Sequence, residues 1–199
     1  MKIGIMGGTF NPIHNGHLLI AENARSQYQL DKVWFLPAGV PPHKADRGIL
    51  PGEVRLEMVR LATEDHPDFA ASDFELLSKE RNYTYLTLER LHAQFPDTEF
   101  YFIMGGDSVE SFHTWRNPQI ICQYSHLLAA VRDEMDINRL KAAATQIREA
   151  FQGTIDFVNT PNFSVSSHEI RTRLQSGDTI RYLVPEAVRD YIMEHQLYR

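Results

Sequence analysis

Cysteine is almost absent from this sequence: Cys122 is the single one among 199 residues. One thiol excludes an internal disulfide framework and a zinc site built from several cysteines. Its apolar surroundings, IICQYSHLLAAV, favour a buried structural thiol. Long hydrophobic runs are absent too, since none approaches the ~18 residues of a membrane span, and MKIGIMGG has too short an apolar run for a secretory signal. We therefore expect a cytoplasmic protein with no membrane partner.

Positive charge is scarce as well. Lysine and arginine number 20 against 26 aspartates and glutamates, which gives a formal net charge of −6. This balance argues against a protein whose main task is to coat nucleic acid, so we expect no nucleic-acid partner. An anionic small molecule is still allowed, because charge within a pocket can oppose the overall sign. The length suits one domain with a full hydrophobic core, alone or with a small appendage.

Short apolar runs alternate with longer segments of helical period. The expected strands cover Lys2–Met6, Lys32–Ala38, Phe69–Leu77, Glu99–Gly106, His126–Arg132 and Gly153–Thr160. The expected helices cover His17–Tyr28, Pro51–His66, Thr84–Phe95, Asn117–Tyr124, Ile137–Phe151, Ser166–Gly177 and Pro185–Leu197. Pro51 is expected just inside its helix, and Gly177 is expected to end another.

Strands separated by helices predict right-handed crossovers and a parallel sheet covered on both faces. The fold class is therefore α/β, a doubly wound, Rossmann-like sheet with a small helical C-terminal portion. We place the Rossmann-like core at residues 1–164 and the helical portion, packed on the core, at 165–199. Ligands bind such sheets beyond the carboxyl ends of the strands. The loops to search are Met6–Gly16, Pro37–Lys44, Gly105–Trp115, Arg132–Met135 and Asn159–Ser167.

The first of these loops, GGTFNPIHNGH, matches neither the dinucleotide fingerprint nor the G-K-[ST] phosphate loop. Gly7 and Gly8 would let backbone N–H groups approach phosphate oxygens closely. His14 and His17 are three residues apart, so they share a face if both lie in the first turn of a helix. A helix N-terminus attracts anions, and two imidazoles would add donors. A zinc site is disfavoured, because H-E-x-x-H and a third ligand are absent.

Four further residues could bind a ligand or have an ordinary structural role. Lys44, after PPH, could reach a phosphate or be a solvated surface lysine. Ser166 and Ser167 begin a helix, where either could be an ordinary N-cap. Arg171 follows one turn later and could grip phosphates beside them.

Two residues follow the glycines of GGDSVESFHTWRN. Asp107 could accept hydrogen bonds from ribose hydroxyls or cap a helix. Trp115 could stack on a flat heterocycle or simply cover the core. The residues alone leave both alternatives open.

A resemblance narrows these alternatives. GGTFNPIHNGH resembles the H-x-G-H signature of the nucleotidylyltransferase superfamily. PPHK, NYTYLTLERL, FIMGGDSVESFHTW, VSSHEIRTRL and LVPEAVRDYIMEHQLY then follow in the order typical of bacterial nicotinate mononucleotide adenylyltransferases. The similarity extends from residue 3 to residue 198. H-x-G-H alone indicates only the superfamily, whereas the combination indicates this family.

The resemblance implies transfer of the adenylyl group of ATP to nicotinate mononucleotide, which gives deamido-NAD and pyrophosphate. It implies Mg²⁺ carried with ATP and no metal site of the protein's own. The implied catalytic residues are His14, His17, Lys44 and Arg171. The implied ATP-binding residues are Gly7, Gly8, Thr9, Phe10, His14, His17, Gly105, Asp107, Ser166, Ser167 and Arg171. The implied nicotinate mononucleotide-binding residues are Asn11, Lys44, Thr84, Trp115 and Arg116. The C-terminal portion would complete the ATP site.

Three positions depart from the family pattern. Asn11 replaces an aspartate, His168 a threonine and Leu86 an aspartate. Two alternatives also stay open: another acceptor, such as phosphopantetheine or nicotinamide mononucleotide, and a catalytically silent nucleotide-binding regulator. The sequence leaves open whether the protein is a monomer or a homo-oligomer.

Overall fold

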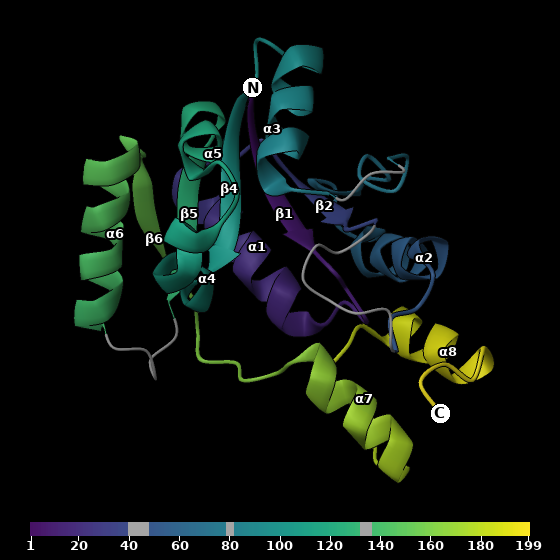
Figure 1. The fold of residues 1–199 in the computed structure, drawn as a ribbon. Helices are drawn as coiled ribbons and strands as arrows, with labels where there is room; N and C mark the ends of the chain where they lie inside the picture. Colours follow the sequence, from purple (N-terminus) through teal and green to yellow (C-terminus); the bar gives the residue numbers. More distant parts are fainter. Residues whose placement is uncertain (40–47, 79–81, 132–136) are drawn as a thin grey trace.

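The computed structural model describes residues 1–39, 48–78, 82–131 and 137–199. A six-stranded sheet with the order β3-β2-β1-β4-β5-β6 runs through its centre, and each pair of neighbouring strands in it is parallel (Figure 1). The strands are β1 (Lys2–Gly8), β2 (Lys32–Pro37), β3 (Phe69–Ala71), β4 (Glu99–Gly105), β5 (His126–Val131) and β6 (Ile155–Asn159). This order is that of a Rossmann-like doubly wound sheet, so the predicted fold class is confirmed.

Helices connect the strands. They are α1 (Asn15–Tyr28), α2 (Gly52–Thr63), α3 (Thr84–Gln94), α4 (Gly106–Ser111), α5 (Pro118–Tyr124), α6 (Ile137–Phe151), α7 (Ser167–Ser176) and α8 (Glu186–Glu194), with a short 3₁₀ turn, η1 (Phe112–Thr114). Among the described residues, no helix is long and apolar enough to cross a membrane.

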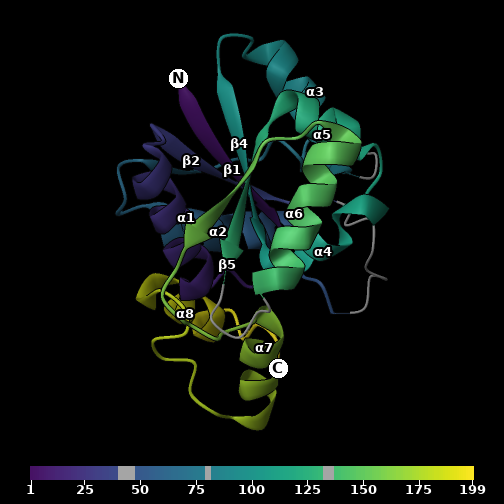
Figure 2. The same cartoon turned by 90° about the vertical axis from the view of Figure 1, so that its left-hand side faces the viewer.

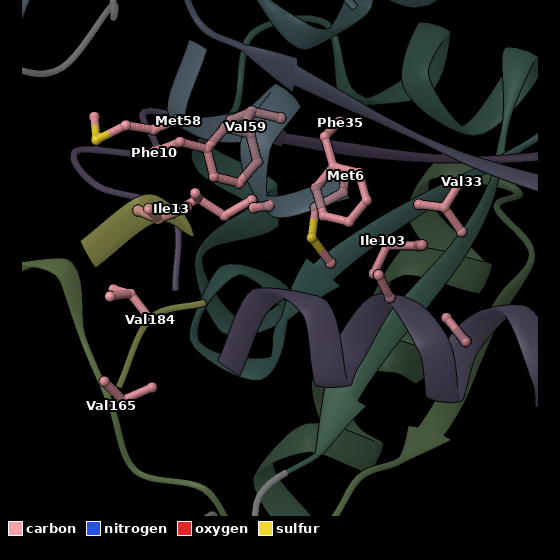
Figure 3. Close-up of a cluster of buried hydrophobic side chains, with 14 of the residues drawn as sticks. Met6, Phe10, Ile13, Val33, Phe35, Met58, Val59, Ile103, Val165 and Val184 are labelled. Carbon is pink, nitrogen blue, oxygen red and sulfur yellow. The ribbon is translucent and has the colours of Figure 1, made fainter. Parts of the chain in front are cut away.

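Alternation along the strands divides the core into two layers. Ile3 and Ile5 of β1 pack on one face, with α3, α4, α5 and α6, while Met6 packs on the other, with α1, α2, α7 and α8. Successive side chains of a strand point to opposite faces, so one strand serves both layers. Figure 3 shows the second layer, in which Met6 and Phe35 of the sheet lie near Val59 of α2.

Local sequence explains the helices that pack on these faces. Leu140, Ala144 and Ile147 recur at helical spacing along α6, and all three are buried against the sheet. Ser166 caps α7 by accepting a hydrogen bond from the Glu169 N–H at 3.1 Å, and Gly177 ends that helix with φ +76°. The predicted end at Gly177 is thus confirmed.

Several predicted bounds were wrong. β1 runs on to Gly8, because its last residues still pair with Leu36 and Pro37 of β2. The strand expected at Phe69–Leu77 stops at Ala71, since the N–H groups of Leu76 and Leu77 turn back to the Asp73 carbonyl.

Two further expectations about helix starts were wrong. Gly106–Ser111 forms the short helix α4 where a loop was expected. Pro51 precedes α2 as its N-cap instead of lying inside it.

The winding of the sheet reverses between β1 and β4, which are neighbours in space and connect to strands on opposite sides. Beyond the carboxyl ends of these strands lie α7 and α8 (Figures 1 and 2). A ligand is expected at this reversal point in sheets of this kind.

Candidate active site

A cavity of about 450 Å³ opens at the reversal point of the sheet. Strand β1 contributes Ile5, Gly7 and Gly8 to its wall, β4 contributes Phe102, and Ala38 follows β2. The opposite side comes from the start of α3 and from the segment after η1. The volume lies within the range of ordinary small-molecule sites.

The cavity gathers residues expected to serve both substrates. Its lining includes Gly7, Gly8, Thr9, Thr84, Trp115 and Arg116. Thr84 is the first residue of α3, while Trp115 lies about thirty positions further along, at the end of η1. The fold thus brings together the two segments expected to bind the pyridine ring.

Trp115 both covers the core and lines the cavity. Its ring meets Phe102 edge-on, with centroids 6.0 Å apart, and lies 5.5 Å from the Phe112 ring. Beside it, the Arg116 guanidinium lies 4.9 Å from the centroid of the Tyr83 ring, a cation–π distance. These contacts hold the Trp115 ring and the Arg116 guanidinium on the same side of the cavity.

The glycines at the ends of β1 and β4 differ in whether the surrounding atoms leave room for a side chain. A Cβ on Gly8 would approach the Phe10 ring to 3.1 Å, so packing alone disfavours a side chain there. A Cβ on Gly7 would meet only Phe102, at 3.8 Å, and one on Gly105 would meet nothing within 4 Å. Packing within the protein therefore does not require glycine at Gly7 or Gly105. The lack of a side chain at these two strand ends leaves room for a ligand to approach the backbone closely.

His14 and His17 form a stacked pair at the start of α1. His14 is the N-cap residue and His17 is the third residue of the helix. Their ring centroids are 3.6 Å apart with an interplanar angle of 22°, and Phe10 meets His17 edge-on at 5.0 Å. The sequence spacing predicted this shared face. His14 is only 4% exposed, so its ring is firmly held.

The start of α7 lies against the loop that precedes these histidines. The Ser167 hydroxyl donates to the Pro12 carbonyl at 2.8 Å, and the Arg171 guanidinium donates to the Asn11 carbonyl at 2.8 Å. Ser166 uses its hydroxyl as the helix cap. Residues about 150 positions apart in the sequence therefore lie at one site.

Asn11 is buried, and its side chain is already used within the protein. Its amide donates to the Gly48 carbonyl at 2.8 Å, and its Oδ1 accepts from the Leu50 N–H at 3.1 Å and the Tyr198 hydroxyl at 2.9 Å. These contacts fix the loop after β1 to the C-terminus. A contact between Asn11 and a mononucleotide stays a prediction.

The remaining expected residues are placed as follows. Asp107 is exposed in the first turn of α4, whose N-cap is Gly105, so Asp107 does not cap this helix. His168 is exposed in the first turn of α7, and Leu86 is half-buried in α3. Lys44 lies outside the described residues. Within the described part of the chain, no group of three or more His, Cys, Asp or Glu side chains could hold a metal ion.

Sequence reasoning missed a buried arginine that joins the loops of the site. Arg55 of α2 is 1% exposed and donates to the carbonyls of Thr9 at 2.7 Å, Ala38 at 2.6 Å and Leu50 at 2.9 Å. Its burial lowers the pKa of its guanidinium. Helical spacing gave no sign of this, because an arginine on an amphipathic helix is ordinarily solvated.

A second missed group lines the cavity itself. Glu75, Asn82 and Thr87 come from the turn after β3 and from the beginning of α3. The Thr87 hydroxyl donates to the Glu75 carboxylate at 2.7 Å, and the Asn82 amide donates to the Glu75 carbonyl at 3.0 Å. A lone glutamate in SDFELL carries no pattern that could have indicated its burial.

Comparison with known proteins agrees with this geometry. A family model described as "Cytidylyltransferase-like" matches residues 5–173. The chain therefore belongs to the cytidylyltransferase-like family.

Close relatives place it more narrowly, with the nicotinate-nucleotide adenylyltransferases. It is 43% identical over 197 residues to a protein of Lachnoclostridium phytofermentans named "Probable nicotinate-nucleotide adenylyltransferase", covering 99% of this chain and 98% of that one. A Desulfitobacterium hafniense protein of the same name is 41% identical over 198 residues, covering 100% and 96%.

A solved structure shows the same fold. It is the Plasmodium falciparum nicotinic acid mononucleotide adenylyltransferase complexed with NaAD, with a TM-score of 0.80 and 20% identity, over 99% of this chain and 97% of that one.

Proposed function

We propose that this protein transfers the adenylyl group of ATP to nicotinate mononucleotide, giving deamido-NAD and pyrophosphate in NAD biosynthesis. The observation that carries the proposal is the cavity at the β1–β4 reversal, where Thr84, Trp115 and Arg116 meet the glycine-rich end of β1. Full-length similarity to nicotinate-nucleotide adenylyltransferases supports the same reaction.

The pyridine ring of nicotinate mononucleotide would occupy this cavity. Trp115 offers its ring for stacking, and Thr84 offers its hydroxyl and a backbone N–H of the first turn of α3, where N–H groups lack partners within the helix. Arg116 brings a positive charge to the same wall, which favours an acid over an amide. Asn11 and Lys44 remain proposed contacts of the mononucleotide.

The ATP phosphates would lie across the loop after β1. His14 and His17 at the start of α1, with the N-terminus of α7 and Arg171, surround this loop from both sides. A helix N-terminus and nearby cations are suited to bind phosphate. Thr9, Phe10, Gly105, Asp107, Ser166 and Ser167 complete the proposed ATP site. In this arrangement the helical portion at 165–199 completes a site that the core begins.

The chemistry needs no base and no covalent intermediate. The phosphate of the mononucleotide is already ionised at neutral pH, and it attacks the α-phosphorus of ATP in line while pyrophosphate departs. The obstacle is the repulsion among several anions, which positioning and electrostatic stabilisation overcome. His14, His17, Lys44 and Arg171 are the proposed groups for this. Mg²⁺ enters with ATP as part of the substrate and neutralises the departing pyrophosphate.

The experiment that tests the proposal follows both products. Purified protein is mixed with ATP, Mg²⁺ and nicotinate mononucleotide, and deamido-NAD and pyrophosphate are measured separately. Equal amounts of both support the proposal. Pyrophosphate release with phosphopantetheine but not with the mononucleotide would assign another acceptor, and binding of ATP with no turnover of either acceptor would support a silent nucleotide-binding regulator.

A reduced, cytoplasmic location fits the proposed pathway and belongs to the proposal.

A further inference from the structure

Glu75 is a buried carboxyl group on the wall of the proposed pyridine pocket. It is 8% exposed and lines the same cavity as Thr84 and Trp115. One of its carboxyl oxygens, Oε1, accepts the Thr87 hydroxyl at 2.7 Å. The other, Oε2, has no hydrogen-bond partner among the described residues. The described part of the chain thus supplies a partner to only one oxygen of this buried carboxyl group.

The surroundings disfavour a negative charge at Glu75. Apolar side chains of Ile5, Leu88, Phe102 and Ile121 line much of the cavity. Burial raises the pKa of Glu75 to about 7, although the Thr87 hydroxyl and the charge of Arg90 oppose that rise. Near neutral pH the empty pocket therefore holds a mixture of the neutral and ionised carboxyl.

The charged groups around Glu75 come from two directions. Arg90 of α3 acts on it electrostatically, and Arg116 stands on the same cavity wall after η1. Tyr83, a titratable group at the N-cap of α3, also lines the cavity and lies under the Arg116 guanidinium. Neither Arg90 nor Arg116 forms an ion pair with Glu75, so neither fixes it in its ionised form.

The acid substrate brings a second carboxylate into this space. When two carboxylates share one desolvated site, the pKa of one of them is strongly raised and the pair holds a proton. The substrate carboxyl is attached to a cationic pyridinium ring, which makes it the stronger acid, so the proton resides on Glu75. A neutral Glu75 can then donate a hydrogen bond from Oε2 to the substrate, whereas an ionised one repels the substrate.

Resting on the proposed function, we propose that Glu75 is a specificity-determining residue of the pyridine pocket, which takes up a proton from solvent when the nicotinate form binds. The nicotinamide form carries no carboxylate and does not require this proton. Preference for the acid over the amide should therefore fall as the pH rises.

Titration calorimetry and steady-state kinetics test this directly. Binding of nicotinate mononucleotide is measured at pH 8 in HEPES and in Tris, whose different ionisation enthalpies report the protons taken up. We expect uptake of about one proton. Nicotinamide mononucleotide carries the same phosphate and serves as the blank, with uptake near zero. In turnover, KM for the acid should rise with pH above pH 7, approaching about tenfold per pH unit by pH 9.

Three variants separate Glu75 from other groups. Glu75→Gln should abolish both the proton uptake and the rise in KM. Glu64→Gln, at an exposed position at the end of α2, should retain both. Thr87→Val removes the donor that stabilises the ionised form, so the rise in KM should begin at a higher pH. If Glu75→Gln does not fold, the pH at which KM begins to rise in Thr87→Val tests the role of Glu75 by itself.

The outcomes distinguish this inference from the proposed function. Turnover of nicotinate mononucleotide with no proton uptake, and with the same KM–pH profile in Glu75→Gln as in the unmodified protein, would overturn the role of Glu75 and leave the reaction intact. Absence of turnover with the acid at every pH would overturn both.

Discussion

The backbone N–H of His14 donates a hydrogen bond to Nδ1 of His17 at 3.2 Å, while the two rings stack. An Nδ1 that accepts a hydrogen bond carries no proton, so neutral His17 holds its proton at Nε2. The N-cap backbone thus selects the tautomer, and His17 offers a donor at Nε2. The proposed mechanism assigns His17 to the phosphates, and we expect it to act there through this N–H.

Replacing His17 by alanine should lower turnover by about 10²–10³-fold, because one preorganised donor to the developing charge is lost. The measurement is kcat for pyrophosphate release at saturating ATP and mononucleotide. His195→Ala, at the exposed C-cap of α8, is the matched control and should not change kcat. Near-normal turnover in His17→Ala would contradict the role of this histidine.

Replacing Arg55 by alanine should destabilise the protein by about 3 kcal/mol or more. The substitution removes the shared donor of the Thr9, Ala38 and Leu50 carbonyls and leaves a cavity where the buried Arg55 side chain was. Urea unfolding measures the change. Arg60→Ala, on the same helix but with a side chain 57% exposed, should shift the free energy of unfolding by no more than about 0.5 kcal/mol. Equal effects of the two would refute the account of Arg55.

Replacing Trp115 by alanine should raise KM for nicotinate mononucleotide about tenfold or more, since a stacking surface of the pocket is lost. KM for ATP should change much less. Because Trp115 also packs on Phe102 and Phe112, thermal unfolding must show that the variant is folded at the assay temperature. Trp34→Phe, on β2 and outside the cavity lining, is the control. A larger effect on ATP than on the mononucleotide would exclude the stacking role.

Cys122 should react slowly with iodoacetamide at neutral pH. Burial raises the pKa of its thiol to about 11, so the reactive thiolate is scarce at pH 7.5 and increases about tenfold per pH unit toward pH 11. Mass spectrometry of the intact protein follows the alkylation. Cys122 does not line the proposed pocket, so Cys122→Ala should keep its turnover. Rapid labelling at pH 7, or lost activity in a folded Cys122→Ala variant, would contradict this prediction.

The fold could be predicted from the sequence because its signals are local. Apolar runs marked all the strands, and the spacing of Leu140, Ala144 and Ile147 marked a helix packed on the sheet. Ser166 and Gly177 marked the two ends of α7 by their known preferences. The short helix α4 could not be predicted, because six residues after a strand give too little periodicity and because Gly106 within it disfavours a helix.

The site could be predicted in part. Motifs at strand ends indicated the histidine pair and Trp115, and the family resemblance added Thr84 and Arg116. Glu75 and Arg55 could not be found in this way, since their burial depends on elements that meet only in the folded protein. Each looks like an ordinary surface charge within its own segment. Physical interactions between distant segments, such as Arg171 with Asn11, likewise have no local signature.

The central claim is that nicotinate mononucleotide is the acceptor of the adenylyl group. One comparison of two substrates tests this claim most directly. The ratio of kcat/KM for nicotinate mononucleotide to that for nicotinamide mononucleotide is measured at pH 7 with ATP and Mg²⁺. We predict a strong preference for the acid, with deamido-NAD as the product. Equal use of both, or preference for the amide, would contradict the assignment of the pocket formed by Thr84, Trp115 and Arg116.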